Sequence, residues 1–316
     1  MPDTGAVWSL KLTERRNVKP LNFDLLNLTR RCGEGSFSTQ ATRARGLQQL
    51  ADELHALGFG MKAARNLAPR HVAALVTSWK ANGISDATIR NRLGWVRWWA
   101  EKVGKGSMIP ADNAAYGLEV RRRYNGNKAQ ELTRDILDRL ADPRIELALQ
   151  LERLFGLRRE EALKLRPVVA DQGKRLVLQA SWTKGGRYRE LPIWHPRQRK
   201  LLDELRAICG DGSLIGEGRN YVQAQKHYDN TLIKHGVRNA HGFRHRYAQW
   251  RYKTLTGWDC PAAGGPTADK MTPEQIRRDR SVRFRISHEL GHGRLEVTDT
   301  YLGRARPLPE GRRAAA

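Results

Sequence analysis

A short stretch near the C-terminus carries side chains that could act together on a phosphodiester. It begins with His241-Gly242-Phe243-Arg244-His245, continues with Gly291-His292, and places Tyr301 nine positions after His292. A guanidinium can bind two phosphate oxygens at once, an imidazole can share a proton, and a tyrosine hydroxyl can form a covalent intermediate. The stretch therefore predicts nucleophilic chemistry at phosphorus.

Two upstream stretches offer the other groups that this reaction needs. Arg158 follows Gly156-Leu157 and precedes Glu161, and Lys184 lies in the segment Thr183-Lys184-Gly185-Gly186. Arg158 and Arg244 could stabilise the charge that develops on the phosphate oxygens during displacement. Lys184 could supply a proton to the leaving oxygen. Taken singly, Arg158 could equally be an ordinary surface partner of the neighbouring carboxylates.

These residues resemble, in their order along the chain, the motifs of the tyrosine recombinases, the phage-integrase family. Gly156-Leu157-Arg158, two further residues and Glu161 resemble the first arginine box. The later motifs match the family's mobile lysine at Lys184, its second box at His241-x-x-Arg244-His245, its Gly-His element at Gly291-His292 and its nucleophile at Tyr301. Any one match is weak evidence, whereas six matched positions in order make a specific signal. The resemblance covers about residues 20–302.

The resemblance implies a site-specific DNA recombinase, the integrase of a mobile element, that forms a 3′-phosphotyrosyl link through Tyr301. It implies that Lys184 is the general acid and that Glu161 supports Arg158. Because the covalent link keeps the bond energy, no ATP, metal or other cofactor is expected. The expected partner is double-stranded DNA, bound by a homotetramer on two DNA sites. Accessory DNA-bending or directionality factors would also be compatible.

Three alternatives use the same residues differently. A catalytically inactive DNA-binding protein would share the fold, and a type IB topoisomerase would share the chemistry. The segment His288-Glu289-Leu290-Gly291-His292 also matches the short zinc-protease motif, in which two histidines one helical turn apart bind the metal. The longer form of that motif needs Gly and His where this chain has Leu295 and Thr298. We therefore predict no metal site.

Composition agrees with a nucleic-acid partner. The 316 residues include 57 Lys and Arg but only 33 Asp and Glu, which gives a formal net charge of +24. Such a surplus favours a polyanion, because neutralised phosphates release counterions. The chain has no apolar run long enough for a membrane span, no secretory signal pattern at its start, and three widely spaced cysteines. These features predict a protein of the bacterial cytoplasm, associated with the nucleoid and not with a membrane.

The elements that would position these groups are mostly helical. Residues 42–103 show apolar spacings of three and four, with Pro69 opening one helix and Ser85 capping the next. This last helix carries three arginines, and a basic linker follows it. We predict that both contact DNA, through Arg90, Arg92, Arg97, Arg121, Arg122 and Arg123.

The predicted fold is mainly α with a small antiparallel β-sheet. Residues 1–20 would be irregular, residues 21–116 a helical, SAM-like core-binding domain, residues 117–130 the basic linker and residues 131–316 a mixed α+β catalytic domain. Within the latter, Thr133 is a candidate N-cap and residues 175–193 a hairpin around Gly185-Gly186. Arg244 and His292 are 48 residues apart, about twice the family's usual spacing, which predicts an insertion near 254–280 that reads as a loop.

Overall fold

The structure is a computed structural model that describes residues 19–118, 124 and 126–305. The chain divides into two compact units, residues 1–121 and 122–316, and this division falls inside the predicted linker. The described residues are mostly helical, with one two-stranded antiparallel sheet, so the predicted fold class is confirmed. No helix among the described residues is both long and apolar enough to cross a membrane.

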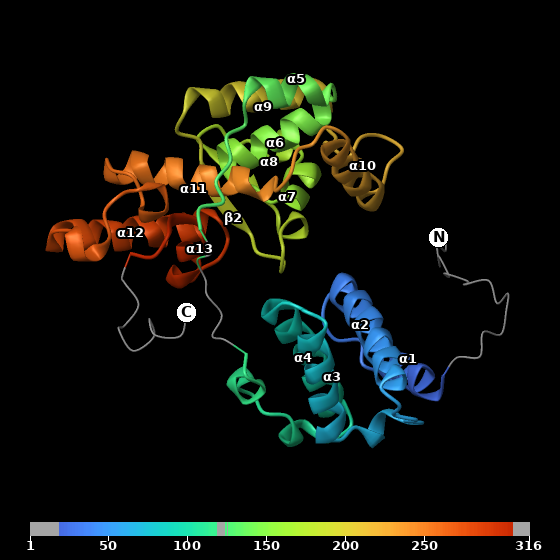
Figure 1. Ribbon diagram of the computed structural model, residues 1–316. Helices are drawn as coiled ribbons and strands as arrows, with labels where there is room; N and C mark the ends of the chain where they lie inside the picture. Colours follow the sequence, from blue (N-terminus) through green and yellow to red (C-terminus); the bar gives the residue numbers. More distant parts are fainter. Residues whose placement is uncertain (1–18, 119–123, 125, 306–316) are drawn as a thin grey trace. The chain divides into compact units, whose positions relative to one another are not determined.

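The first unit is a bundle of four helices. They are α1 (Pro20–Arg31), α2 (Phe37–Ala56), α3 (Pro69–Ala81) and α4 (Asp86–Lys102) (Figure 1). As predicted, Pro69 begins α3 and the Ser85 side chain caps α4 by accepting a hydrogen bond from the Thr88 amide. The backbone of α2 lies close to α4, because a Cβ added at Gly46 would lie 2.3 Å from the Trp95 ring.

The pattern at 42–103 missed the first helix of this unit. α1 lies before that range and α2 begins at Phe37, five residues earlier than predicted. The signal was present, since Leu21, Leu25 and Leu28 recur at helical spacing and are buried in the core of the unit. Pro20 also stands at the first position of α1, where its missing N–H costs nothing.

The described part of the second unit consists of helices and a small sheet, with one helix, α11, buried among its neighbours. Its elements are α5 (Arg134–Leu140), α6 (Pro143–Phe155), α7 (Arg159–Lys164), α8 (Pro167–Ala170), β1 (Arg175–Leu178), β2 (Arg189–Pro192), α9 (Pro196–Cys209), α10 (Tyr221–Lys234), α11 (His241–Thr256), α12 (Pro273–Glu289) and α13 (Asp299–Leu302). α11 lies between α6 and the pair formed by α12 and α13 (Figure 1). Side chains on all sides of α11 are therefore buried, including charged ones.

The predicted hairpin exists, but its turn is longer than expected. β1 and β2 pair antiparallel, with Leu176 opposite Leu191 and Leu178 opposite Arg189. Gly185-Gly186 is not a tight two-residue turn. It lies in a longer connection that also holds a 3-10 turn at Ala180–Trp182. Lys184 therefore lies in the connection, outside the paired strands.

The extra segment between Arg244 and His292 is not one loop. α11 continues to Thr256, two 3-10 turns follow at Pro261–Ala263 and Ala268–Lys270, and α12 begins at Pro273. The insertion near 254–280, predicted to be a loop, thus includes the end of α11 and the start of α12, a helix that the sequence analysis did not assign. Its start signal was readable, because the Thr272 side chain accepts a hydrogen bond from the Gln275 amide in a capping box.

Candidate active site

The six predicted catalytic residues come from five places in the second unit. Arg158 directly precedes α7, where α6 has ended at Gly156 in the left-handed conformation. Lys184 lies in the connection between β1 and β2, and both residues of the second box lie in the first turn of α11. His292 follows α12, and Tyr301 lies in α13.

The two arginines meet at the carbonyl of Leu290. This oxygen accepts a hydrogen bond from Nη2 of Arg158 at 3.2 Å and from Nη2 of Arg244 at 2.5 Å. Arg244 also donates through Nη1 to the carbonyl of Gly156. Arg244 is fully buried, whereas the Arg158 side chain is about a fifth exposed. Backbone carbonyls therefore hold the two guanidinium groups side by side before any phosphate arrives.

A buried carboxylate, that of Glu161, contacts Arg158 beside this pair. Its Oε1 accepts from Nη1 of Arg158 at 2.6 Å, and its two oxygens accept from Nη1 and Nη2 of Arg189 at 2.9 and 2.7 Å. Burial alone would raise the pKa of Glu161, but the charges of Arg189, Arg244 and Arg158 outweigh it and lower the pKa to about 2. Glu161 is therefore an anion at neutral pH and neutralises part of the surrounding charge.

Arg189 is a site residue that the sequence analysis missed. It lies in β2 with its side chain 7% exposed, on the same face of the strand as the fully buried Leu191. Side chains two positions apart on a strand point to the same side. An arginine two residues before a core leucine was therefore a readable sign of a buried partner. Nothing in the sequence showed that this partner is Glu161.

The Tyr301 hydroxyl points into the arginine and histidine group. The side chain is 4% exposed, and its oxygen lies 3.0 Å from Nε2 of His292. Nε of Arg244 donates to the same oxygen at 3.4 Å, and Nη2 of Arg244 lies 3.4 Å from Nε2 of His292. Because a guanidinium only donates, Nε2 of His292 accepts. The Tyr301 hydroxyl then donates its proton toward His292.

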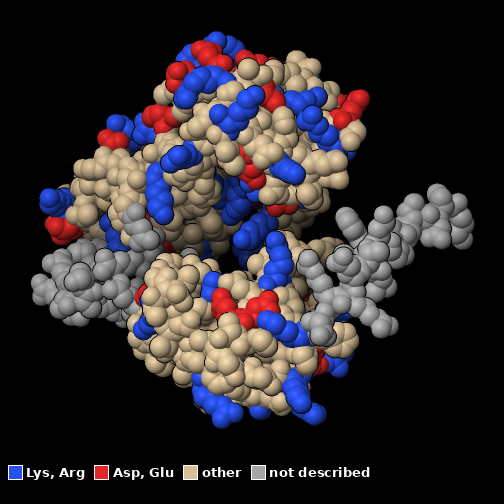
Figure 2. All heavy atoms as spheres, turned by 45° about the vertical axis from the view of Figure 1, so that its right-hand side comes forward, with Lys and Arg blue, Asp and Glu red and all other residues tan. Residues whose placement is uncertain are grey.

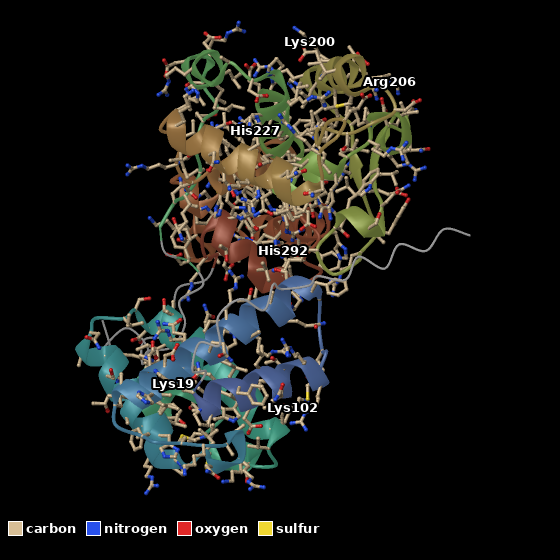
Figure 3. All side chains as sticks on the ribbon, turned by 90° about the vertical axis from the view of Figure 1, so that its right-hand side faces the viewer. Lys19, Lys102, Lys200, Arg206, His227 and His292 are labelled. Carbon is tan, nitrogen blue, oxygen red and sulfur yellow. The ribbon has the colours of Figure 1, made fainter. Side chains whose placement is uncertain are left out.

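The histidines of the site are neutral in the DNA-free protein. Burial, followed by the charges of Arg244 and Arg158, lowers the pKa of His241 to about 4 and that of His292 to about 3. The ring centroids of His245 and Tyr301 lie 4.5 Å apart, so the two rings pack against each other. Figure 3 labels His292 near the C-terminal helices. His227, which belongs to no motif, lies apart from it on α10.

Lys184 and His241 line one cavity with Arg158, whereas Arg244, His292 and Tyr301 are not part of its lining. The cavity has a volume of about 890 Å³ and is lined by Arg158, Lys184 and His241 together with residues of α10. Lys184 is exposed, as a residue that must approach a bound strand would be. At the cavity's inner wall the Tyr228 hydroxyl donates to the buried Glu152 at 2.7 Å, and burial raises the pKa of Glu152 to about 8.

The predicted DNA-contacting arginines already have partners within the first unit. Arg90 pairs with Asp86, Arg92 pairs with Glu53 at 2.9 Å, and Arg97 donates to the carbonyl of Pro110. The linker arginines Arg121, Arg122 and Arg123 lie outside the described residues. Figure 2 shows Lys and Arg side chains spread over both units, with Asp and Glu side chains among them. Which basic residues contact DNA therefore stays a prediction.

The geometry does not form the zinc-protease arrangement. α12 ends at Glu289, and Gly291 adopts a φ of +69°, so His288 and His292 do not lie on consecutive turns of one helix. The Glu289 carboxylate accepts hydrogen bonds from Tyr247 and Arg251. Within the described part of the chain, no three His, Cys, Asp or Glu side chains are placed to hold a metal ion. The observations thus give no support to this alternative.

Comparison with known proteins points to one family. Residues 18–109 match the family model for the N-terminal domain of phage integrases, and residues 121–250 match the integrase model. No match was found among curated protein sequences. The two matched ranges together span more than two thirds of the chain and include Arg158, Lys184, His241 and Arg244.

Solved recombinases share the fold at low sequence identity. A lambda integrase (residues 75–356) dimer bound to a COC′ core site has a TM-score of 0.58 at 13% identity, covering 92% of this chain and 98% of that one. XerH bound to its difH substrate has a TM-score of 0.52 at 17% identity, covering 92% and 82%. The Tn1549 transposon integrase with transposon right-end DNA has a TM-score of 0.53 at 12% identity, covering 92% and 98%. These structures show that the chain shares their fold, and the two family matches, which together cover most of the chain, show that it belongs to the phage-integrase family, the tyrosine recombinases.

Proposed function

We propose that this protein is a site-specific DNA recombinase, the integrase of a mobile element, which cuts and rejoins strands through a phosphotyrosine at Tyr301. One observation carries the proposal. The Tyr301 hydroxyl lies 3.0 Å from His292 and within reach of Arg244, and Arg244 shares the Leu290 carbonyl with Arg158. A nucleophile, a proton acceptor and two phosphate-binding cations thus lie together before DNA binds.

In the proposed first step the Tyr301 oxygen attacks phosphorus. A bond forms between phosphorus and the tyrosine oxygen, the bond to the 5′ oxygen breaks, and the hydroxyl proton moves to a base. His292 is the histidine at hydrogen-bond distance, since its Nε2 lies 3.0 Å from the hydroxyl; the ring centroids of His292 and His241 lie 5.6 and 6.1 Å from that of Tyr301. Lys184 would protonate the departing 5′ oxygen. Arg158 and Arg244 would bind the non-bridging oxygens as their charge grows.

The second step reverses the first on another strand. A 5′ hydroxyl of the partner DNA attacks the 3′-phosphotyrosine, the new phosphodiester forms, and Tyr301 leaves with a proton. No energy source is consumed, because one phosphodiester replaces another. The role of Glu161 is to hold Arg158 and Arg189 in place, so it stays outside the bond-making steps.

Assembly and location follow from the same proposal. Lambda integrase has also been solved as a tetramer bound to a Holliday junction. We expect this chain likewise to act as a homotetramer on two double-stranded DNA sites, with accessory DNA-bending or directionality factors as further partners. It would work in the bacterial cytoplasm, at the nucleoid. No observation favours an inactive DNA-binding protein, because all six reactive side chains are present.

Trapping the covalent intermediate tests the proposal. The protein is incubated in EDTA with nicked duplexes that carry the ends of its mobile element, and a covalent protein–DNA adduct is sought by denaturing electrophoresis. Tyr301→Phe should bind the duplex but give no adduct. Tyr116→Phe, which alters a tyrosine of the first unit, should give one. Absence of an adduct on every cognate end, or an adduct that persists in Tyr301→Phe, would contradict the proposal.

A further inference from the structure

The residues that follow α11 pack against α13, the short helix that carries Tyr301. We call residues 257–272, between α11 and α12, the clasp segment. Its Cys260 is fully buried and belongs to the same hydrophobic cluster as Tyr301 and Leu302. The indole of Trp258 donates to the Tyr252 hydroxyl at 3.2 Å, which ties the segment to α11. This part of the chain is the excess length that the family's motif spacing left unassigned.

The clasp segment touches the chain just after the tyrosine. The amide of Ala268 donates to the carbonyl of Ala305 at 2.6 Å. Gly303 lies directly against Ala262, because a Cβ added at Gly303 would lie only 2.7 Å from the Ala262 nitrogen. Gly303 also adopts a φ of +76°, which favours glycine. Both contacts involve backbone atoms rather than the ends of flexible side chains.

Two neighbouring helices donate hydrogen bonds to two more backbone carbonyls of residues 301–305. Nη1 of Arg283, on α12, donates to the carbonyl of Gly303 at 2.9 Å, and its Nε donates to Asp279. Nε2 of Gln249, on α11, donates to the carbonyl of Tyr301 at 3.1 Å. The chain from the tyrosine onward is therefore bound at three carbonyls by three different elements.

These contacts matter because α13 cannot hold itself in place. It has four residues, and a helix of one turn has no stability of its own. The position of the Tyr301 hydroxyl is consequently set by what binds the backbone on either side of it. A nucleophile displaced by about 1 Å can lose on the order of a hundredfold in rate.

We propose that the clasp segment is the positioning element for Tyr301. The proposal rests on the recombinase function above. Gly303 and Ala268 are its two key positions, because one permits close packing on Ala262 and the other donates to Ala305. Neither residue touches the reacting groups.

Gly303→Ala tests the packing contact. The added Cβ must push Ala262 away, so we expect the rate of adduct formation on saturating DNA to fall at least tenfold, while the affinity for DNA stays within twofold. Gly218→Ala is the matched control, since Gly218 has a φ of +70° and no atom within 4 Å of an added Cβ. It also places an alanine at a positive φ, without crowding, and should keep the wild-type rate.

Ala268→Pro tests the backbone contact between Ala268 and Ala305. Ala268 is the first residue of a 3-10 turn and follows Thr267 in an extended conformation, a place where proline fits. The substitution removes the donor to Ala305, and the proline ring carbon that replaces the amide hydrogen also pushes the Ala305 carbonyl away. We again expect a slower adduct step at unchanged DNA affinity. If both variants match the wild-type rate, the clasp has no positioning role. Failure of the wild-type protein itself to form an adduct would instead refute the recombinase function.

Discussion

At the scale of single residues, the active site depends on one buried carboxylate among several cations. Glu161 accepts hydrogen bonds from Arg158 and Arg189 and lies 3.9 Å from Arg244. Without it, three guanidinium groups would repel one another in a poorly solvated space. A buried charge that loses its partner is costly, whereas an exposed ion pair contributes little.

Glu161→Gln should therefore destabilise the fold as well as slow cleavage. The amide keeps the size of the side chain but leaves buried Arg189 without a counter-charge, so the free energy of unfolding should fall by about 3–5 kcal/mol. Denaturant unfolding measures this change. Glu160→Gln is the control, because Glu160 pairs with Lys164 near the surface and should change stability by less than about 1 kcal/mol. Equal losses for both variants would contradict the assignment.

Glu152 predicts a pH dependence of stability. Its pKa is raised from 4.5 to about 8, so between these values the folded state holds a proton that the unfolded state has released. The stability of the wild-type protein should therefore decrease as pH rises through this range. Gln mimics the protonated acid and can still accept from Tyr228. Glu152→Gln should thus gain stability relative to wild type on going from pH 5 to pH 8, as thermal unfolding at each pH would show. A stability difference between the two proteins that stays the same from pH 5 to pH 8 would refute this prediction.

At the scale of elements, the end of α6 links folding to the site. Gly156 ends the helix with a φ of +64°, and its carbonyl accepts from Arg244. A Cβ added there would lie 2.4 Å from the Tyr247 ring. Gly156 therefore ends α6, leaves room for α11 to pack closely, and supplies the carbonyl that holds Arg244.

Gly156→Ala should be more harmful than a typical Gly→Ala change at a turn. We expect a loss of about 1–2 kcal/mol from the left-handed backbone and roughly 1–3 kcal/mol more from crowding against Tyr247. Gly173→Ala is the control, with a φ of +73° and open space around the added Cβ, so it should show the backbone cost alone. Chemical denaturation of both variants measures the difference. Equal losses of stability in Gly156→Ala and Gly173→Ala would contradict the predicted crowding at Tyr247.

At the scale of the whole molecule, the charge of +24 should dominate affinity for DNA. Each phosphate neutralised by Lys or Arg releases condensed counterions, so the binding constant falls linearly with salt on a logarithmic scale. If six to ten phosphates are contacted, the affinity for a cognate duplex should drop by about 10³–10⁵-fold between 50 and 200 mM salt. Fluorescence anisotropy at several salt concentrations measures the slope. An affinity nearly independent of salt would exclude a phosphate-dominated interface.

Much of the fold could be predicted from local signals. Pro69, Ser85, Thr133 and Gly156 act within a few residues of themselves, and the structure shows each one beginning or ending a helix. α1 and α12 were missed although their signals were equally local, at Pro20 and at Thr272. The long hairpin connection was misjudged because Gly185-Gly186 suits a tight turn and also a longer one.

By itself, the sequence determined which reactive groups this protein has, their order along the chain and the family to which they point. Only the tertiary structure decided how they meet. The carbonyl of Leu290 joins arginines that precede it by 132 and 46 residues, and Arg189 reaches a carboxylate 28 residues earlier. The clasp segment contacts the residues just after Tyr301, which follow it by more than thirty positions. No local pattern encodes such contacts, because they arise when separate elements pack around α11 and bring distant backbone groups together.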